Sequence, residues 1–397
     1  MVENKDKKVL NVPNLRFPEF EGEWEKCKLG DITQNFTRRN KEKIQYPMFS
    51  VTNERGFVPQ SEQFEGRDMV GDDIKAYKII QSQEFAYNPA RINVGSIAMY
   101  SGKAPCMISS LYVCFKTTQK VDDEWLMQLL KTAKLNYCYN VNGEGGVRVY
   151  LFYPNFARIR VSLPSLTEQK KIACFLNLLD ERISTQNKII EDLKKLKSAI
   201  IEVHYKQCEK HNVQVADLGE PFNAGNLSKE DLSETGTRCI LYGELFTTYG
   251  EIINEVINHT NTLKGMTLSK KGDLLFPSST TVDAISLIAP SVINVDNVVL
   301  GGDMFGIHID SNYNAQYLSY YFNHIAKRLL AKYAKGSTII HLHYKDIEQA
   351  ELLLPNLDEQ NRMANCLMSL DDKIGVETAF LNLQMCKKNY LLRQMFI

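Results

Sequence analysis

The sequence lacks the features that identify a membrane or secreted protein. Its 397 residues contain no run of about 18 apolar residues, the length that a membrane-spanning helix requires. The N-terminus Met1–Lys8 has no apolar core of a signal peptide. Nine cysteines, an odd number, show no CxxC or similar ligand spacing. We therefore expect a cytoplasmic protein with reduced, inert thiols, and no disulfide framework or metal site.

The sequence also lacks the motifs of nucleotide and base chemistry. A motor needs GxxxxGK[ST] to hold phosphates, and Gly-Lys occurs only at Gly102–Lys103, before Ala104. An adenine methyltransferase needs an Asn/Asp-Pro-Pro-aromatic tetrad, and the nearest string, Asn88–Arg91, lacks the second proline and the aromatic residue. Asn142–Gly146 is rich in glycine but is not GxGxxG after a strand. No acidic spacing indicates a nuclease, so we expect no intrinsic catalysis.

A net charge of zero conceals an asymmetry along the chain. Residues 24–162 carry 19 Lys+Arg against 14 Asp+Glu, whereas residues 210–353 carry 11 against 16. A protein that coats nucleic acid without specificity would be basic throughout. Any nucleic-acid contact must therefore use local patches, or partners must supply much of the attraction to phosphate.

The sequence contains one segment that occurs twice. Leu163-Pro-Ser-Leu-Thr-Glu-Gln169 returns as Leu354-Pro-Asn-Leu-Asp-Glu-Gln360, 191 positions later, and matches continue at that shift through Asp180 onto Asp371 and Lys197 onto Lys388. Solenoid repeats have periods of roughly 20–50 residues, so this one is not a solenoid. It is a duplicated unit of domain plus helix, which predicts two similar halves.

Each repeated segment predicts a long helix. From Thr167 to about Gln207 there is no Pro or Gly, and apolar residues alternate in steps of three and four, as in the seam of a coiled coil. Such a helix is about 55–60 Å long. Ser165 with Glu168, and Asn356 with Glu359, have the spacing of a capping box at each helix start. Polar residues interrupt both seams, and they indicate either buried polar pairs or local exposure: Gln186, Lys197, Glu377, Gln384 and Lys388.

Between the helices, short β-branched and aromatic runs alternate with Gly, Asn, Asp and Pro turns, so we expect an α+β domain in each half. Predicted strands include Leu111–Phe115, Leu274–Phe276 and Ile285–Ile288, and helical stretches run from Glu124 to about Tyr139 and from Ala315 to about Tyr333. The domains correspond more weakly than the helices, at positions such as Gly145 with Gly336 and Tyr153 with Tyr344. The helices thus resemble a shared frame, and the domains its variable part.

The chain resembles the specificity subunit of bacterial type I restriction–modification enzymes over essentially its whole length. The resemblance rests on the order of several motifs on the duplicated frame. They are Asn11–Phe20, Trp24–Ile32, Tyr87–Gly95, Gly272–Ser279, Lys335–Thr338 and both Leu-Pro-x-Leu-x-Glu-Gln segments. The ending Tyr390–Ile397 also resembles that of a full-length subunit, so we expect one.

The resemblance implies the fold and the partners. We expect two target-recognition domains, joined by two long helices that form an antiparallel coiled coil. The expected boundaries are an N-terminal segment packing on the frame (1–23), the first recognition domain (24–162), the central helix (163–209), the second recognition domain (210–353) and the C-terminal helix (354–397). Each domain would read half of a bipartite DNA site, and the helices would set the spacer and hold two methyltransferase subunits, which motor-nuclease subunits join. S-adenosylmethionine, ATP and magnesium belong to those partners, and this chain is expected to bind no cofactor.

Residues that contact DNA must offer paired donors and acceptors to base edges, or cations to phosphates. In the first domain the candidates are basic or amide side chains in turn-rich segments, and each has an alternative as a solvated or turn-forming residue. They are Arg38, Arg39, Lys41, Thr52, Asn53, Arg55, Asn88, Arg91, Asn93, Lys103 and Arg148.

The second domain has few basic residues, so its reading is expected to depend on hydroxyls, amides and aromatic side chains. Four hydroxyls follow Pro277 in a predicted loop, and Lys335–Thr338 is suited to holding a phosphate. His341 and His343 lie on one face of a predicted strand, where hydrogen bonding is favoured over metal binding because no third ligand is evident. The full set is Tyr242, Glu244, Ser278, Ser279, Thr280, Thr281, Lys335, Ser337, Thr338, His341 and His343.

One alternative of a different class remains. A coiled-coil assembly protein could carry the same frame while its α+β domains bind proteins instead of DNA. Sequence preference for a split DNA site separates the two hypotheses.

Overall fold

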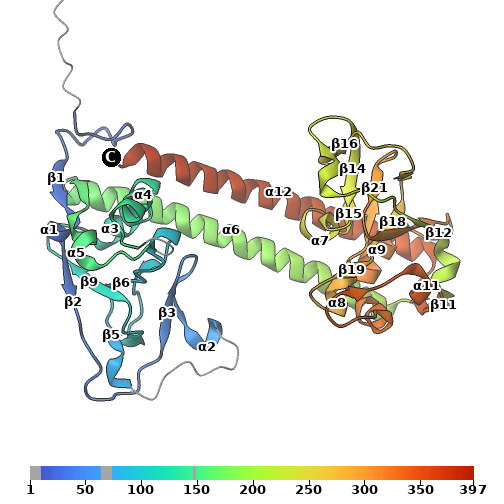
Figure 1. Cartoon of the computed structure of the whole chain (residues 1–397), viewed down its shortest axis with the longest axis horizontal. Helices are drawn as coiled ribbons and strands as arrows, with labels where there is room; N and C mark the ends of the chain where they lie inside the picture. Colours follow the sequence, from blue (N-terminus) through green and yellow to red (C-terminus); the bar gives the residue numbers. More distant parts are fainter. Residues whose placement is uncertain (1–9, 64–73, 146–148) are drawn as a thin grey trace, which may run out of the picture. The chain divides into compact units, whose positions relative to one another are not determined.

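The structure is a computed structural model, and it describes residues 10–63, 74–145 and 149–397. Two helices dominate it, α6 (Leu166–Gln207) and α12 (Leu357–Met395), as Figure 1 shows in green and red. The chain divides into two compact units, residues 1–186 with 380–397 and residues 187–379. Each unit therefore contains one mixed domain and a segment of both long helices, which confirms the predicted α+β fold with two long helices.

The repeated Gln fastens each long helix to its domain. In the first unit the Gln169 side chain donates to the Pro164 carbonyl (2.8 Å) and accepts from the Asp122 backbone N–H (2.7 Å). In the second, Gln360 donates to Pro355 (2.8 Å) and accepts from Asn314 (2.9 Å). Both amides are buried. Because Asp122 and Asn314 cap the domain helices α3 (Asp123–Leu130) and α9 (Ala315–His324), one side chain joins two helix starts in each copy.

The helix starts contain only half of the predicted capping boxes. Ser165 accepts the backbone N–H of Glu168 (3.3 Å), and Asn356 accepts that of Glu359 (2.9 Å). The two carboxylates have other partners: Glu168 binds Arg16 at 2.7 Å, and Glu359 binds His204 at 2.9 Å.

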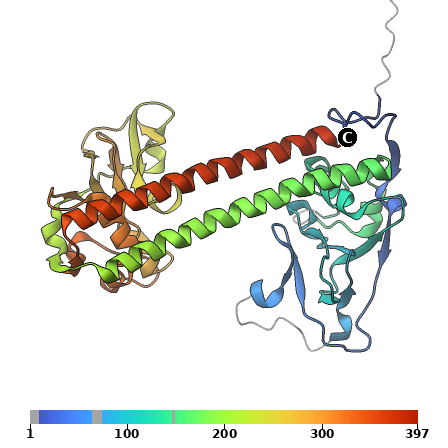
Figure 2. The same ribbon diagram turned by 180° about the vertical axis from the view of Figure 1, so that it is seen from behind.

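Within each unit the two helix segments run antiparallel. In the first unit Asp180 pairs with Lys388, and the Arg182 guanidinium lies over the Phe380 ring, 5.8 Å from its centroid. In the second unit Lys197 pairs with Asp371, and His204 pairs with Glu359. In both units a later residue of α6 thus meets an earlier residue of α12, as antiparallel packing requires. Figures 1 and 2 show the helices side by side from both sides. The predicted apolar seam is buried or half-buried at every position: Leu176, Leu179, Ile183, Ile190, Leu193, Ile200, Leu367, Leu370, Ile374, Leu381 and Leu391.

The polar seam positions Lys197 and Lys388 each take part in an ion pair, and the pair is repeated in the two units. Asp180–Lys388 in the first unit and Asp371–Lys197 (2.7 Å) in the second are the same pair at the 191-residue shift. Each Asp also accepts from its own domain, from Gln128 (2.8 Å) and from the Tyr320 hydroxyl (2.5 Å). Of the two readings of the interrupted seam, burial is correct for Lys197, Gln186 and Gln384, whereas Lys388 and Glu377 are half-buried.

The two domains share a sheet order. In the first domain a sheet runs β2-β9-β6-β7, and in the second β12-β22-β18-β20-β15. A stacked Phe pair occupies equivalent cross-strand positions, Phe85 with Phe115 (4.9 Å between centroids) and Phe276 with Phe305 (5.0 Å). Each domain is closed by a two-stranded antiparallel ribbon of its first and last strands, β1-β10 and β11-β24. The duplication therefore includes the inner sheet and the closing ribbon as well as the helix.

The first-domain elements not bounded above are short. They are β1 (Glu25–Lys28), α1 (Leu29–Ile32), β2 (Thr33–Phe36), β3 (Phe49–Thr52), β4 (Gly56–Pro59), α2 (Gln60–Gln63), η1 (Ile74–Ala76), β5 (Lys78–Ile80), β6 (Phe85–Tyr87), η2 (Ile92–Val94), β7 (Ile97–Met99), β8 (Cys106–Ile108), β9 (Val113–Thr117), α4 (Ala133–Asn142), α5 (Tyr153–Arg158) and β10 (Arg160–Leu163). The hairpin β3-β4 and the pair β5-β8 lie outside the shared sheet.

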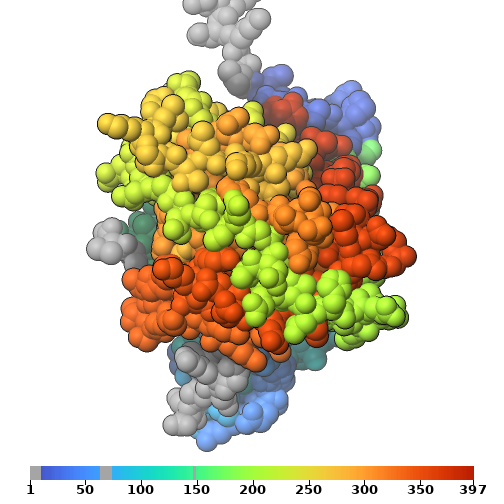
Figure 3. All heavy atoms as spheres, turned by 90° about the vertical axis from the view of Figure 1, so that its right-hand side faces the viewer, coloured from blue at the N-terminus to red at the C-terminus, as the bar shows by residue number. Residues whose placement is uncertain are grey.

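The second domain contains a further five-stranded sheet, β13-β16-β14-β21-β17. The described part of the first domain has the corresponding pairings as separate pieces, the antiparallel pair β5-β8 and a parallel bridge between Met48 and Met107, where the second has β17-β21 and β14-β21. Its elements are β11 (His211–Gln214), η3 (Val215–Leu218), β12 (Gly219–Asn223), η4 (Lys229–Asp231), β13 (Leu232–Ser233), β14 (Thr237–Leu241), α7 (Glu244–Thr247), β15 (Ile252–Ile253), β16 (Asn258–Thr260), β17 (Thr267–Leu268), β18 (Asp273–Pro277), β19 (Ser279–Thr280), α8 (Ala284–Leu287), β20 (Ser291–Ile293), β21 (Val299–Gly301), β22 (Met304–Ile309), α10 (Lys327–Leu330), η5 (Ala331–Tyr333), β23 (Ile340–His341), α11 (Tyr344–Ile347) and β24 (Glu351–Leu354). Figure 3 shows this unit's surface, where yellow-green residues that begin the domain lie against orange-red residues that end it.

Several local predictions were wrong. Ile285–Ile288, predicted as a strand, lies largely in helix α8, because Asp283 caps it by accepting the Ser286 N–H (2.8 Å). The helical stretch from Glu124 breaks between α3 and α4, where the Thr132 hydroxyl caps the second helix. The stretch from Ala315 likewise divides into α9, α10 and η5.

The structure also contains no described helix with the length and apolarity to cross a bilayer. That finding covers residues 10–63, 74–145 and 149–397.

We predict that Glu251 contributes pH-dependent stability to the second unit. Burial raises the pKa of its carboxyl, but the hydrogen bond from His324 and the charge of Lys197 outweigh burial and hold the pKa at about 2. A depressed carboxyl pKa contributes stability above the unfolded value and loses it as the pH falls toward the folded value. Glu251→Gln should therefore lower the free energy of unfolding by about 2 kcal/mol at pH 7.

Urea unfolding between pH 7 and pH 2 measures this effect. The difference between wild type and Glu251→Gln should shrink as the pH falls below about 4.5. Glu255→Gln, at an exposed position nearby in the chain, is the control. A pH-independent difference would contradict the assigned role of the carboxylate charge.

Candidate nucleic-acid interface

Four predicted residues of the first domain come together around one small cavity. Thr52 and Asn53 at the end of β3, and Asn88 and Arg91 after β6, line a pocket of about 210 Å³. These segments are far apart in the sequence, and β3 and β6 belong to different sheets. The tertiary fold thus places two amides, a hydroxyl and a guanidinium within one concave site, the mixture that guanine and adenine edges require.

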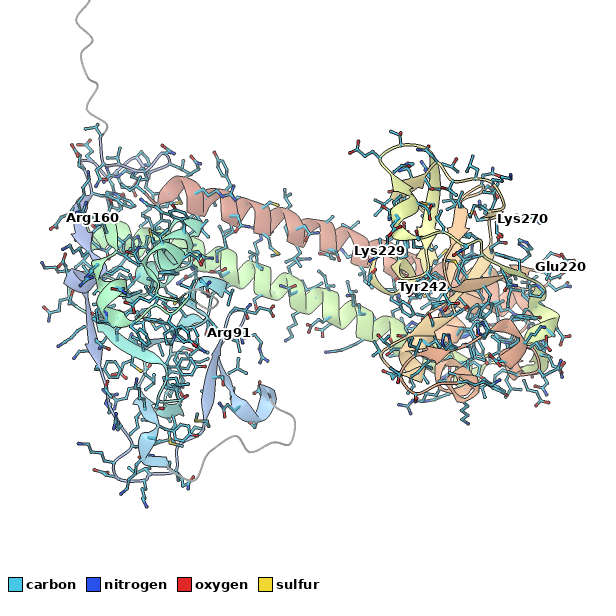
Figure 4. All side chains as sticks on the ribbon, in the orientation of Figure 1. Arg91, Arg160, Glu220, Lys229, Tyr242 and Lys270 are labelled. Carbon is cyan, nitrogen blue, oxygen red and sulfur yellow. The ribbon has the colours of Figure 1, made fainter. Side chains whose placement is uncertain are left out.

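Arg91 is the exposed cation of this site. It precedes the short helix η2, and its backbone carbonyl accepts from Val94 and Ser96, which fixes the turn. Its side chain is exposed, and the described residues include no ion-pair partner for it. Gly95, at φ 96°, allows close packing on Asn53. Figure 4 shows Arg91 well apart from Arg160, which lies on the closing ribbon of the same domain. The guanidinium is therefore held by a rigid turn and remains available to a ligand.

A second cavity adjoins the first and shares Asn88 and Arg91. It has a volume of about 540 Å³, and its remaining wall includes Leu111, Tyr150 and Phe152. These three side chains are exposed, Leu111 by 77%. Sequence reasoning missed them, because exposed apolar residues have no pattern of their own. A signal existed in the 191-residue shift, which aligns Tyr150 and Phe152 with His341 and His343.

The basic residues that follow β2 differ in whether they have a partner within the domain. Arg38 forms two hydrogen bonds with Glu84 (2.8 and 2.7 Å), which raise the pKa of the guanidinium, and it lies over the Phe36 ring. Arg39 and Lys41 are exposed. Arg38 therefore has a structural partner that DNA would have to replace, whereas its two neighbours are accessible.

The other first-domain candidates vary in the same way. Arg55 pairs with Glu62 at the surface (3.0 Å), and Asn93 donates to Asn140 (2.9 Å). Lys103 is exposed. Arg148 lies outside the described residues.

In the second domain the structure joins two predicted segments into one ribbon. Strand β19 pairs with β23, with Ser279 opposite His341 and Thr280 opposite Ile340. The expected loop of four hydroxyls is therefore wrong for its first members: Ser278 and Ser279 are buried, Thr280 is half-buried and only Thr281 is exposed. Backbone pairing accounts for this, because Leu342 N–H donates to Ser278 (2.9 Å).

Around the same ribbon lie the predicted cation and imidazoles. Lys335 pairs with Asp346 (2.5 Å), an interaction that lowers the pKa of this carboxyl, whereas Ser337 and Thr338 are exposed. His341 belongs to β23, but His343 precedes α11, so the single strand expected for both is wrong. Their rings stack at 6.1 Å all the same. No cluster of metal-ligating residues occurs in the part of the chain that the structure describes.

Tyr242 and Glu244 differ in accessibility. Tyr242 follows β14 and lies against Gly302, next to Asp303, whose carbonyl accepts from Ser278 (2.8 Å). It is 36% exposed and is labelled in Figure 4. The Glu244 carboxylate accepts from Leu241 N–H (2.8 Å) and from the Asn258 amide (2.6 Å), so it is engaged within the domain. Tyr242 is therefore the more accessible of the two.

The fold defines a protein of two repeated mixed domains, each attached to segments of both long helices. The sequence profile described as "Type I restriction modification DNA specificity domain" matches the chain twice, over residues 21–195 and 209–383. The chain therefore belongs to this family. It is the specificity subunit of a type I restriction–modification system, a non-catalytic subunit for DNA recognition, as its sequence predicted.

Individual relatives agree with the family assignment over nearly the whole length. The putative type I restriction enzyme MjaX specificity subunit of Methanocaldococcus jannaschii is 23% identical, covering 93% of this chain and 92% of its own. The MjaVIII specificity subunit of the same organism is also 23% identical, covering 94% and 91%. Among solved structures, the S subunit of the type I system of M. genitalium has the same fold, with a TM-score of 0.59, 13% identity and coverage of 97% and 99%. A chain from a structural study of type I complex assembly has a TM-score of 0.56, 14% identity and coverage of 93% and 96%.

We predict that Arg91→Ala weakens binding at one half-site only. Loss of a bidentate guanine contact should cost about 1–3 kcal/mol and relax the preference at one base pair. The measurement is a binding titration of the assembled complex on its target duplex and on single-base variants of each half-site. Arg158→Ala removes an exposed cation of the same domain and serves as the control. Unchanged affinity together with unchanged preference would refute the assignment.

Proposed function

We propose that the chain directs its complex to an asymmetric, bipartite DNA site, with each domain reading one half. The observation that carries this proposal is the contrast between equivalent positions of the repeat. Asn88 and Arg91 of the first site correspond to Ser279 and Val282 of the second. Side chains of different hydrogen-bonding capacity recognise different base edges. A palindromic target would require the same groups in both copies.

The charge difference between the domains supports the same asymmetry. The first domain, with its excess of five cations, has the exposed Arg91 at its site, whereas the candidates of the second, with an excess of five acids, are mainly hydroxyls and imidazoles. Phosphate attraction at the second half-site must therefore come largely from partner subunits.

The frame supports binding of two like partners. The Gln that fastens helix to domain and the Asp–Lys pair occur once in each unit, with equivalent partners. We therefore propose that two methyltransferase subunits bind equivalent surfaces of the two units and that motor-nuclease subunits join them. S-adenosylmethionine, ATP and magnesium are assigned to those partners. The cytoplasm, where the DNA target lies, is the proposed location.

The helices are proposed to set the spacer between half-sites. Helix α6 is unbroken over 42 residues and α12 over 39, and both continue from one unit into the other. At 1.5 Å per residue, α6 is about 60 Å long, more than one turn of B-DNA at about 34 Å.

Sequencing of methylated sites in cells that express the whole complex tests the function. We expect one split motif with unlike halves and a fixed spacer. A gel-shift assay with reconstituted methyltransferase subunits then separates recognition from the adaptor alternative. Equal binding to the motif and to random duplex would favour the adaptor.

We predict that one heptad inserted into each helix lengthens the spacer. Insertion between Gln186 and Asn187 and between Ala379 and Phe380 keeps the seam in phase and adds about 10 Å, or about 3 base pairs. Both half-sites should stay unchanged, because the domains are untouched. Methylome sequencing gives the new spacer, and a motif with the old spacer would contradict the ruler role. A four-residue insertion at the same places is the control, since it puts the seam out of phase and should destabilise the frame.

A further inference from the structure

Each domain presents a stacked pair of rings at the same position of the repeat. Tyr150 and Phe152 stack at 6.2 Å between centroids with an interplanar angle of 12°. His341 and His343 stack at 6.1 Å and 16°. The shift of 191 aligns the first pair with the second, ring for ring. The stacked geometry is the same in both domains, although the side chains change from Tyr and Phe to two His residues. We take a position that keeps its geometry while its chemistry changes as a functional one.

The backbone that holds each pair is also repeated. Tyr150 exchanges two hydrogen bonds with Glu144 (2.8 Å each), and His341 exchanges two with Lys335 (2.9 and 2.7 Å). Between the rings lies a Leu that is fully buried in its domain core, Leu151 in one and Leu342 in the other. Because this Leu points into the core, the residues before and after it point the opposite way. Both rings therefore lie on one face, as alternate residues do along a strand. The rings are thus fixed in position, not merely exposed.

Both pairs adjoin the candidate reading residues. Tyr150 and Phe152 share the 540 Å³ cavity with Asn88 and Arg91. His341 is paired directly with Ser279, the residue that corresponds to Asn88. The Tyr150 and Phe152 side chains are 37% and 48% exposed, and that of His341 is 45% exposed. Rigid rings exposed beside a binding site generally belong to the contact surface.

We propose that these ring pairs are equivalent base-contacting platforms, apolar in the first domain and hydrogen-bonding in the second. Tyr150 and Phe152, with Leu111 beside them, form an apolar surface for the 5-methyl group of a thymine next to the base that Arg91 contacts. His341 and His343 donate from imidazole N–H to a purine N7 of the other half-site. This assignment rests on the proposed function of DNA reading and specifies which groups of the bases are read.

Single-atom changes in the DNA test the proposal. The assembled complex is titrated on target duplexes in which each thymine of the first half-site is replaced in turn by uracil, which lacks only the methyl group. One position should weaken wild-type binding about fourfold, as expected for one buried methyl. The variant Tyr150→Ala/Phe152→Ala should bind the thymine and uracil duplexes equally.

The second half-site is tested in the same way with 7-deazapurines, which lack the N7 acceptor. One substitution should weaken wild-type binding about 5- to 100-fold and have no effect on the variant His341→Ala/His343→Ala. Tyr137→Ala and His211→Ala are the controls and should respond as wild type, because Tyr137 is an exposed ring that lines neither first-domain cavity and His211 is an exposed ring of β11, outside the β19-β23 ribbon.

The outcomes separate this inference from the proposed function. The wild-type complex could prefer its split motif and yet bind equally well when uracil or a 7-deazapurine is substituted at every position. That result would overturn the proposed role of the ring pairs and leave the proposed DNA-reading function intact. If the ring variants lose methyltransferase subunits while retaining the base responses, the rings belong to a protein contact and the proposal fails. A complex with no sequence preference at all overturns both.

Discussion

The structure depends on one ion pair between the long helices that occurs twice. Asp180 with Lys388, and Asp371 with Lys197, lie in the seam between the long helices, and each Asp also accepts a hydrogen bond from its domain helix. The lysines are the more enclosed partners, with side chains 16% and 8% exposed, so sliding either helix by one turn would leave two enclosed cations without their carboxylates. This requirement fixes the register of the two helices together with the attachment of each domain.

The fixed frame explains how the domains can differ. Gln169 and Gln360 satisfy the same backbone groups in both copies, so the helix starts and the inner sheets keep their arrangement. Beyond the inner sheet the copies diverge, since one five-stranded sheet of the second domain is matched in the first by the separate pairs β3-β4 and β5-β8. Recognition chemistry varies at positions whose backbone is held constant. Such an arrangement permits a change of one half-site without a change of the frame.

The long helices and the mixed domains could be predicted from the spacing of apolar and turn residues. The family could be predicted from the order of motifs on a repeat that is visible in the sequence. Short elements were harder. Ile285–Ile288 has the composition of a strand, but Asp283 caps it as a helix, and Ser278 and Ser279 are buried by pairing that involves residues more than 60 positions away. Candidate contacts were identified as residue types, but the sequence did not indicate that Glu84 engages Arg38 or that Asn258 engages Glu244.

The sequence by itself determined the duplication, the helical seam and the unequal charge of the two halves, because these are properties of order and spacing along one chain. Only the tertiary structure decided which polar residues meet. Thr52, Asn53, Asn88 and Arg91 form one site because β3 and β6 are brought together from separate sheets. The stacked ring pairs depend on the tertiary structure as well. The two pairs share a position in the repeat, but they form an exposed surface only because the buried Leu151 and Leu342 turn the rings outward.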